Sequence, residues 1–408
     1  MNASLGAASV RKILLYSHDT YGLGHLRRNL AIAFRLLAGH PGRQVVLVSG
    51  SSVSDYFTLP AGLTLVKLPP VIKIGAEQYR PADRRLSVGL VRRIRTAVIA
   101  DVARRFRPDV LLVDHSPAGM NGELLPVFAE LARHSPGTRV ALGLRDILDE
   151  PAAVRSNWTE QGIYDLLEHV YDELYIYGSQ DVFDLGASYG LTQPIRDRLL
   201  YCGYLDKPQS ATTADITVPA MSGPYLLATA GGGGDGTHVL EAAMCAAAAL
   251  GLQSMIVTGP LMDDADRRRL QQCGDSVPGA TVLPFHPQLR AAMTQASVVV
   301  TMGGYNSLCE AVAAGTRTVV IPRVAPRREQ AIRAELFARR GLLDVVLPGP
   351  DLTQRLTTAV GAGASRTSAP SSGLDLTGLE RLTQALGHRA QPDAHRASSV
   401  AAELRRPA

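Results

Sequence analysis

A glycine pair followed by a polar helix start stands near the middle of the C-terminal half. A β-branched run at 298–301 is followed by Gly303 and Gly304, and a helical pattern opens at Asn306 and continues past Glu310. Glycines let the backbone come close to a ligand, and the first N–H groups of a helix point at an anion. Asn306 and Glu310 are four residues apart and therefore share one helix face. The pattern predicts a diphosphate at the helix end, with Glu310 on the ribose diol of a nucleotide.

A second glycine-rich loop contains Gly231, Gly232 and Gly233. It follows a buried run at 225–229 and precedes a helical pattern that opens at Thr237. So many glycines cost backbone entropy unless something must approach closely. A flexible turn is the alternative, but the position directly after a buried strand favours a loop that faces phosphates.

The first strand-to-helix turn carries a candidate general base. Gly22 and Gly24 begin like a dinucleotide fingerprint, but Arg27 replaces the third glycine, and the next buried run, 44–48, ends without a carboxylate. This pattern argues against NAD. The turn places His25 at a helix N-terminus, whose field lowers the pKa and favours the neutral imidazole that a general base requires. A capping or packing histidine is the alternative.

Polar side chains end two further buried runs. Asp114 and His115 follow one run, and Arg145 and Asp146 follow the next. Because ligands of open α/β sheets bind at the carboxyl ends of strands, both pairs could line an acceptor pocket. Asp114 is the second candidate for the base. Ordinary ion pairs at the strand ends are the alternative.

Asp264 and Asp266 match the DxD pattern of metal-dependent sugar transferases. They stand beside Asp263 and three arginines, in what reads as the first turn of a helix. Acidic residues there complement the helix dipole. We therefore expect no metal site and no metal requirement.

Composition excludes several classes of protein. The 408 residues suffice for two domains, and 46% hydrophobic and 19% charged residues exclude wholesale disorder. The net charge of +5 comes from scattered arginines, which argues against nucleic-acid binding. Four dispersed cysteines fit free thiols in a reducing cytoplasm. We expect no membrane span and no signal peptide. A basic amphipathic stretch at 90–106 leads directly into a buried run and therefore favours an ordinary helix that covers the sheet, with peripheral membrane contact as the alternative. The oligomeric state stays open.

Two sets of apolar runs alternate with helical patterns. The first set is 12–16, 44–48, 63–66, 109–113, 139–142, 173–177 and 199–202; the second is 225–229, 254–258, 281–283, 298–301, 318–321 and 343–347. Continuous apolar strands separated by helices predict parallel sheets covered on both faces. We therefore expect an α/β protein with two doubly wound, Rossmann-like domains. The expected segments are a first domain at 1–205, a linker at 206–223, a second domain at 224–360, and a low-complexity stretch with one helix and a tail at 361–408.

These motifs resemble bacterial glycosyltransferases of the GT-B fold. GGYNSLCEAVAAGTRTVVIPR, TYGLGHLRR and GGGGDG resemble the N-acetylglucosaminyltransferases that form lipid II. VDHSPAGMNGEL and LGLRDILDEP resemble more closely a bacterial group of predicted glycosyltransferases. The resemblance covers roughly residues 11–347. It implies a nucleotide-diphosphate sugar as donor substrate, with UDP favoured, no cofactor, and inversion at the anomeric carbon. The acceptor stays open, and a small specialised metabolite of natural-product biosynthesis is favoured.

The resemblance also implies roles for individual residues. Gly303, Gly304, Asn306 and Ser307 would contact the diphosphate and Glu310 the ribose; residues Leu283 to His286, among them Phe285 and His286, would flank the base, and Glu329 and Gln330 would hold sugar hydroxyls. The resemblance also makes 1–205 the acceptor-side domain and 224–360 the nucleotide-sugar-binding domain.

The other expected site residues do not depend on the resemblance. The charge on the leaving diphosphate calls for the glycine loop, with Gly231, Gly232 and Gly233, and for Arg323, and Tyr305 is counted with the donor site. The expected acceptor-side residues are Asp19, Gly22, Gly24, His115 and Arg145.

The lipid II enzymes usually have a His-Gln pair where this chain has Glu329-Gln330, so the sugar stays open, with an amino sugar among the alternatives. A nucleotide-sugar 2-epimerase and a non-catalytic nucleotide-sugar-binding subunit are the rival functions.

Overall fold

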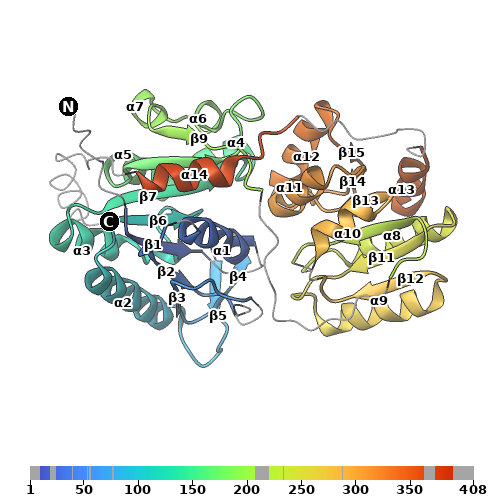
Figure 1. The fold of residues 1–408 in the computed structure, drawn as a ribbon, viewed down its shortest axis with the longest axis horizontal. Helices are drawn as coiled ribbons and strands as arrows, with labels where there is room; N and C mark the ends of the chain where they lie inside the picture. The colour runs from blue at the N-terminus through green and yellow to red at the C-terminus, as the bar shows by residue number, and fades with distance from the viewer. Residues whose placement is uncertain are drawn as a thin grey trace. The chain divides into compact units, whose positions relative to one another are not determined.

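The chain divides into two compact units in this computed structural model. The structure describes residues 10–18, 24–38, 40–52, 54, 57–75, 78–206, 220–232, 234–286, 288–362 and 373–388. Unit 1 takes the described residues of Met1–Asp146, Pro151–Leu205 and Thr377–Ala408, and unit 2 those of Ile147–Glu150 and Asp206–Leu376. Each unit is built around a parallel sheet with helices packed on it (Figure 1).

The sheet of unit 1 has seven strands in the order β3-β2-β1-β6-β7-β8-β9, all parallel. The strands are β1 (Lys12–Ser17), β2 (Gln44–Ser49), β3 (Leu63–Lys67), β6 (Val110–Asp114), β7 (Arg139–Arg145), β8 (Glu173–Tyr177) and β9 (Leu199–Tyr201). β-branched and leucine residues fill the central strands because helices cover both faces. The strand order reverses between β1 and β6, so the topological switch point of this sheet lies at their carboxyl ends.

Helices and one hairpin complete unit 1. The helices are α1 (Gly24–Leu37), α2 (Val88–Phe106), α3 (Leu125–His134), α4 (Pro151–Glu160), α5 (Ile163–His169), α6 (Leu185–Ser188), α7 (Gln193–Arg196) and α14 (Gly378–Gly387). The strands β4 (Val71–Gly75) and β5 (Gln78–Pro81) form an antiparallel hairpin that the sequence patterns did not predict.

Helix α14 packs against α1 although most of the chain separates the two in sequence (Figure 1). Arg139 donates to the carbonyl of Leu386, and Arg35 pairs with Glu380 at 3.1 Å. The leucine spacing at 374–386 predicted this helix but not the unit on which it docks, which is unit 1.

The sheet of unit 2 has six parallel strands in the order β12-β11-β10-β13-β14-β15. The strands are β10 (Tyr225–Thr229), β11 (Gln253–Val257), β12 (Ala280–Leu283), β13 (Val298–Thr301), β14 (Thr318–Val320) and β15 (Asp344–Val345). The helices are α8 (Thr237–Ala249), α9 (Asp264–Ser276), α10 (Leu289–Gln295), α11 (Tyr305–Ala314), α12 (Glu329–Arg339) and α13 (Leu352–Gly361). Its switch point lies between β10 and β13, whose carboxyl ends carry the two glycine turns.

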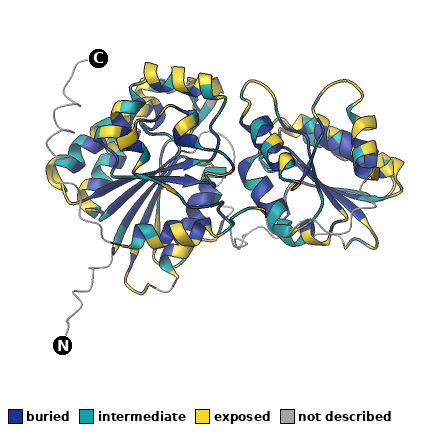
Figure 2. Ribbon diagram, turned by 90° about the horizontal axis from the view of Figure 1, so that it is seen from above, coloured by how far each residue is buried: buried dark blue, intermediate teal, exposed yellow. Residues whose placement is uncertain are grey.

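Burial follows the layered arrangement in each unit (Figure 2). Strands are buried throughout the sheet centres, while the outer faces of the helices are exposed. The predicted fold class, two doubly wound parallel-sheet domains, is confirmed. None of the described helices is long and apolar enough to cross a membrane. Most of the expected linker and the expected tail lie outside the described residues.

Candidate functional site

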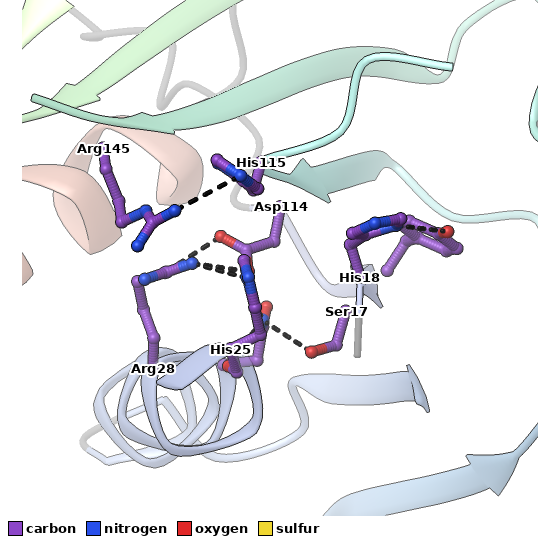
Figure 3. Close-up of polar contacts among 9 residues, drawn as sticks. Ser17, His18, His25, Arg28, Asp114, His115 and Arg145 are labelled. Atoms are coloured by element: carbon purple, nitrogen blue, oxygen red, sulfur yellow. Dashed lines mark hydrogen bonds and ion pairs between the residues drawn. The ribbon is translucent and has the colours of Figure 1, made fainter. Parts of the chain in front are cut away.

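In unit 1, His25, Arg28 and Asp114 meet at the switch point of the sheet (Figure 3). His25 and Arg28 come from the first turns of α1, and Asp114 is the last residue of β6. The Nδ1 atom of His25 lies 2.7 Å from Oδ2 of Asp114. Arg28 donates to both carboxylate oxygens of Asp114, at 2.9 Å and 2.8 Å. Arg28 is one helical turn after His25, which is why both side chains reach the same carboxylate.

The carboxyl group of Asp114 is fully buried and stays ionised. Burial alone would raise its pKa, but the charges of Arg28 and His25 and their hydrogen bonds outweigh that effect and hold the pKa below its usual range. Asn29 also donates to this carboxylate, at 3.2 Å. A carboxylate with a depressed pKa is a poor proton acceptor. The geometry therefore favours Asp114 as the partner that orients His25, and it disfavours the sequence-based alternative that Asp114 is the base.

His25 is poised in the neutral state. Burial lowers its pKa, and the neighbouring Asp114 carboxylate only partly offsets this effect. When Nδ1–H donates to Asp114, the lone pair that can accept a proton is on Nε2. This arrangement is the histidine–carboxylate pairing that general-base catalysis uses.

His115 carries backbone strain next to this network. It has φ 74°, in the left-handed region that few non-glycine residues adopt, directly after β6. Its ring centroid lies 5.1 Å from that of His25, and Arg145 lies 3.3 Å from its Nε2. Burial, and then the charge of Arg145, hold the pKa of His115 well below its usual value. Strained backbone at a strand end is typical of functional sites.

A buried chain of polar groups leads from the same edge to α2. Tyr79 from β5 and Tyr16 from β1 lie 3.3 Å and 3.4 Å from the two ring nitrogens of His18. Tyr16 in turn donates to Glu123 at 2.6 Å, and Glu123 is held by the fully buried Arg95. The network fixes His18, whose ring centroid lies 6.2 Å from that of His25. Sequence patterns did not single out these residues.

In unit 2, two glycine turns meet at the switch point. The turn at Gly303 and Gly304 leads into α11, and Gly304 is its N-cap residue. A side chain at Gly303 would collide with the backbone of Gln330 at 2.7 Å. Gly231 has φ +66°, and a β-carbon there would lie 3.3 Å from Oγ of Ser307. The two turns therefore approach each other closely, as an anion site made of backbone N–H groups requires.

The second glycine loop is also packed from its other side. A β-carbon at Gly259, after β11, would lie 2.5 Å from the carbonyl oxygen of Gly231 and 2.7 Å from that of Gly232. Leu261 donates its N–H to the carbonyl of Gly232 at 3.0 Å. The loop is therefore held in place rather than being a loose turn.

Glu310 lies on the buried side of α11, one turn after Asn306, and is 6% exposed. Phe285 and His286 follow β12, two strands from the switch point. His286 accepts a hydrogen bond at Nδ1 from the N–H of Gln288, and burial lowers its pKa. The role of Glu310 at the ribose and of Phe285 and His286 at the base therefore stays a prediction.

Arg323 is neutralised by two carboxylates. It donates to Glu329 at 2.6 Å and to Asp235 of the glycine loop at 3.3 Å. Burial would lower its pKa, but Glu329 and Asp235 raise it. Its backbone N–H donates to Oε1 of Gln330 at 3.1 Å. Arg323 therefore connects the glycine loop to the start of α12, a role that the sequence did not indicate.

The DxD stretch begins a helix, as expected. Asp263 is the N-cap of α9, and its carboxylate accepts from the N–H groups of Ala265 and Asp266, both at 2.9 Å. Across the described ranges, no group of three or more His, Cys, Asp or Glu side chains is arranged to hold a metal ion.

Asp19, Gly22 and Gly233 lie outside the described residues. Gly24 begins α1, one residue before His25.

Comparison with known proteins agrees with this geometry. Residues 231–363, from the second glycine loop through α13, match the profile of the glycosyltransferase family 28 C-terminal domain. A search of the curated proteins finds no match.

Solved structures share the whole architecture. CalG4, the calicheamicin glycosyltransferase, superposes with a TM-score of 0.56 at 17% identity, covering 97% of this chain and 98% of that one. VinC, a glycosyltransferase solved in complex with DTDP, gives 0.55 at 16% identity, covering 96% and 99%. MurG of Acinetobacter baumannii gives 0.50 at 14% identity, covering 97% and 99%.

At such identities the superpositions show the fold, which is GT-B. The family match covers residues 231–363, about a third of the chain. The chain thus has the GT-B fold, and the match of residues 231–363 to the C-terminal domain of glycosyltransferase family 28 supports a glycosyltransferase.

Proposed function

We propose that this enzyme transfers a sugar from a nucleoside-diphosphate donor, a UDP-sugar first, to a hydroxyl group of a small specialised metabolite in the cytoplasm. The observation that carries the proposal is the placement of the two candidate sites. In each sheet the chemistry-bearing residues stand at the switch point: His25 and Asp114 in unit 1, and the turns at Gly231 and Gly303 in unit 2.

The reaction is a single displacement at the anomeric carbon. The acceptor oxygen forms the new glycosidic bond while the bond to the diphosphate breaks, and the electron pair leaves with the diphosphate. The acceptor proton passes to Nε2 of His25, and Asp114 stabilises the imidazolium that results. One displacement inverts the anomeric configuration. No metal or other cofactor takes part in this scheme.

Backbone N–H groups supply the stabilisation of the leaving group. Negative charge develops on the diphosphate as the bond breaks, and the N–H groups of the first turn of α11 are donors fixed in advance. The loop at Gly231 approaches this turn at Ser307, and the N–H of Gly231 itself donates to Thr229. Arg323 is already balanced by Asp235 and Glu329, so we assign it to holding the loop rather than to the diphosphate.

The pairing of Glu329 bears on the sugar. An unpaired carboxylate would favour a cationic amino sugar, but Arg323 already donates to Glu329 at 2.6 Å. We therefore propose that Glu329 accepts hydrogen bonds from neutral sugar hydroxyls and that the amide of Gln330 donates to them. That VinC was solved with DTDP makes dTDP-sugars the second donor class to test.

A panel of nucleotide sugars tests the proposal. Thermal unfolding is measured with UDP-, dTDP- and GDP-sugars, and a donor that binds the folded protein raises the melting temperature by an amount that grows with the logarithm of its concentration over Kd. Donors that stabilise are then incubated with candidate hydroxyl acceptors, and products are identified by mass spectrometry. Isomerisation of the donor without an acceptor would instead indicate the epimerase, and binding without any turnover would indicate the non-catalytic subunit.

A further inference from the structure

Arg333 of α12 is a fully buried cation with two backbone partners. It is 0% exposed. It donates to the carbonyl oxygen of Gly303 at 3.2 Å and to that of Ile147 at 3.0 Å, and its guanidinium lies 5.6 Å from the ring centroid of Tyr305. A planar guanidinium with fixed donor directions holds two such acceptors in a defined relation. Arg333 therefore fixes the glycine turn that begins the proposed diphosphate site.

The segment Ile147–Glu150 belongs to unit 2, although the residues on both sides of it belong to unit 1. Asp149 accepts a hydrogen bond from the N–H of Arg328, the N-cap residue of α12, at 2.9 Å. Glu150 lies 3.6 Å from the guanidinium of Arg328. The segment thus contacts the start of α12, while Arg333 links it to the Gly303 turn.

The chain immediately before this segment is anchored in unit 1. Asp146 is 1% exposed. It packs so closely on Gly178 that a β-carbon added to Gly178 would lie 2.6 Å from the β-carbon of Asp146. Arg145, one residue earlier, is the partner of His115. The peptide bond between Asp146 and Ile147 therefore joins a residue packed in unit 1 to one held by Arg333 in unit 2. A displacement of Ile147 must change the backbone within two residues of Arg145.

We propose that Arg333 is a positioning residue that couples nucleotide binding at the Gly303 turn to the end of β7, where Arg145 contacts His115. The inference rests on the proposed donor site. A diphosphate that orders the turn at Gly303 also orders the Gly303 carbonyl, to which Arg333 donates. Because Arg333 also donates to the carbonyl of Ile147, residues 143–150 are restrained as well. Because coupling between two sites is reciprocal, the same link makes the position of Arg145 a determinant of donor affinity.

Hydrogen exchange of the full chain tests the coupling. Exchange is followed by mass spectrometry with and without UDP, with dTDP and GDP in parallel, each at saturating concentration. In the unsubstituted protein, we expect the bound nucleotide to slow exchange both in 301–308 and in 143–150. In Arg333→Lys, which keeps the charge but cannot hold two carbonyls in one plane, protection of 301–308 should persist. Protection of 143–150 should fall by about fivefold or more, the lower end of ordinary coupling.

Two further variants keep the result decisive. Arg339→Lys lies on the same helix with its side chain 74% exposed, and it should behave like the unsubstituted protein. Asp149→Asn removes the charge that holds the start of α12 without touching a buried cation. It should reduce the same remote protection if Arg333→Lys fails to fold.

Protection of 301–308 alone in the unsubstituted protein, or full remote protection in folded Arg333→Lys, overturns the coupling but leaves the donor site intact. If Arg333→Lys does not fold, full remote protection in Asp149→Asn overturns it. If no nucleoside diphosphate protects 301–308, the proposed donor site fails and the coupling falls with it.

Discussion

Nδ1 of His25 lies 2.7 Å from a carboxylate oxygen of Asp114, although 89 residues separate them in the chain. The contact joins the first turn of α1 to the last residue of β6 at the switch point of the sheet of unit 1. The contact fixes the imidazole orientation together with Arg28, whose Nη2 lies 2.8 Å from the same Nδ1. In the tautomer whose Nδ1–H donates to Asp114, Nε2 is the atom that can accept a proton.

Replacement of His25 should remove the base and leave the fold intact. We expect His25→Ala to lower kcat by roughly 10²–10⁴-fold, the usual contribution of a positioned base, while donor affinity stays within a few-fold. Steady-state kinetics and calorimetry measure the two quantities. His134→Ala on α3, whose side chain is 58% exposed, is the matched control and should keep its turnover. Near-normal turnover in a stable His25→Ala protein would move the base elsewhere.

Replacement of Asp114 should change the pH profile as well as the rate. The Asp114 carboxylate raises the pKa of His25 against the effect of burial. In Asp114→Asn this contribution is lost, so the acidic limb of kcat/KM, where His25 becomes protonated, should move to lower pH. The plateau should fall by roughly 10²–10⁴-fold because the imidazole loses its orientation. An acidic limb that moves to higher pH would contradict the assigned pairing.

Removal of the Glu310 carboxylate should weaken nucleotide binding. Glu310→Ala should cost about 1–3 kcal/mol, the scale of hydrogen bonds to a charged group. Isothermal titration with UDP and dTDP measures the loss. Glu335→Ala on α12, with a side chain 46% exposed, is the control. Unchanged affinity in a folded Glu310→Ala protein would exclude Glu310 as the ribose contact.

Turnover should not depend on a divalent metal. Asp263 accepts from the N–H groups that begin α9, which assigns the DxD stretch to a helix start. Activity should survive excess EDTA, and Asp264→Asn/Asp266→Asn should retain turnover within a few-fold. Activity that is lost in EDTA and restored by magnesium or manganese would require a metal site.

The pKa of His115 makes unit 1 sensitive to acid. Its folded pKa is well below the ordinary histidine value near 6.5, so the unfolded chain binds the proton more readily. Its contribution to stability is therefore complete above about pH 6.5 and falls as the pH drops below that value. Asn tolerates the left-handed backbone that His115 adopts. His115→Asn should lose less melting temperature between pH 7.5 and pH 5.5 than the unsubstituted protein, and equal losses in calorimetric scans would refute the assignment.

Sequence patterns located the sheets because buried parallel strands are continuous apolar runs, and the rule for strand ends brought His25 and Asp114 to one edge. They missed the β4–β5 hairpin, whose strands of five and four residues are too short for a periodic signal. They also missed Arg28, although its spacing of one turn from His25 was visible. Arg333 gave no signal, because its partners are backbone carbonyls that only the fold brings near. An amphipathic helix shows that it has a buried face, but not which unit buries it, so the docking of α14 could not be predicted.

The packing of α14 on α1 has a consequence for synthesis on the ribosome. Unit 1 contains the first strands to emerge, but it lacks the helix that covers α1 until residues 378–387 have been made. All strands and helices of unit 2 lie in the sequence between the strands of unit 1 and α14. They are therefore complete before α14 has been made. The last helix of unit 1 is therefore made only after all strands and helices of unit 2, whereas N-terminal domains usually emerge complete before the next domain. A chain that ends before residue 378 would contain every strand and helix of unit 2 but would leave α1 without the helix that packs on it.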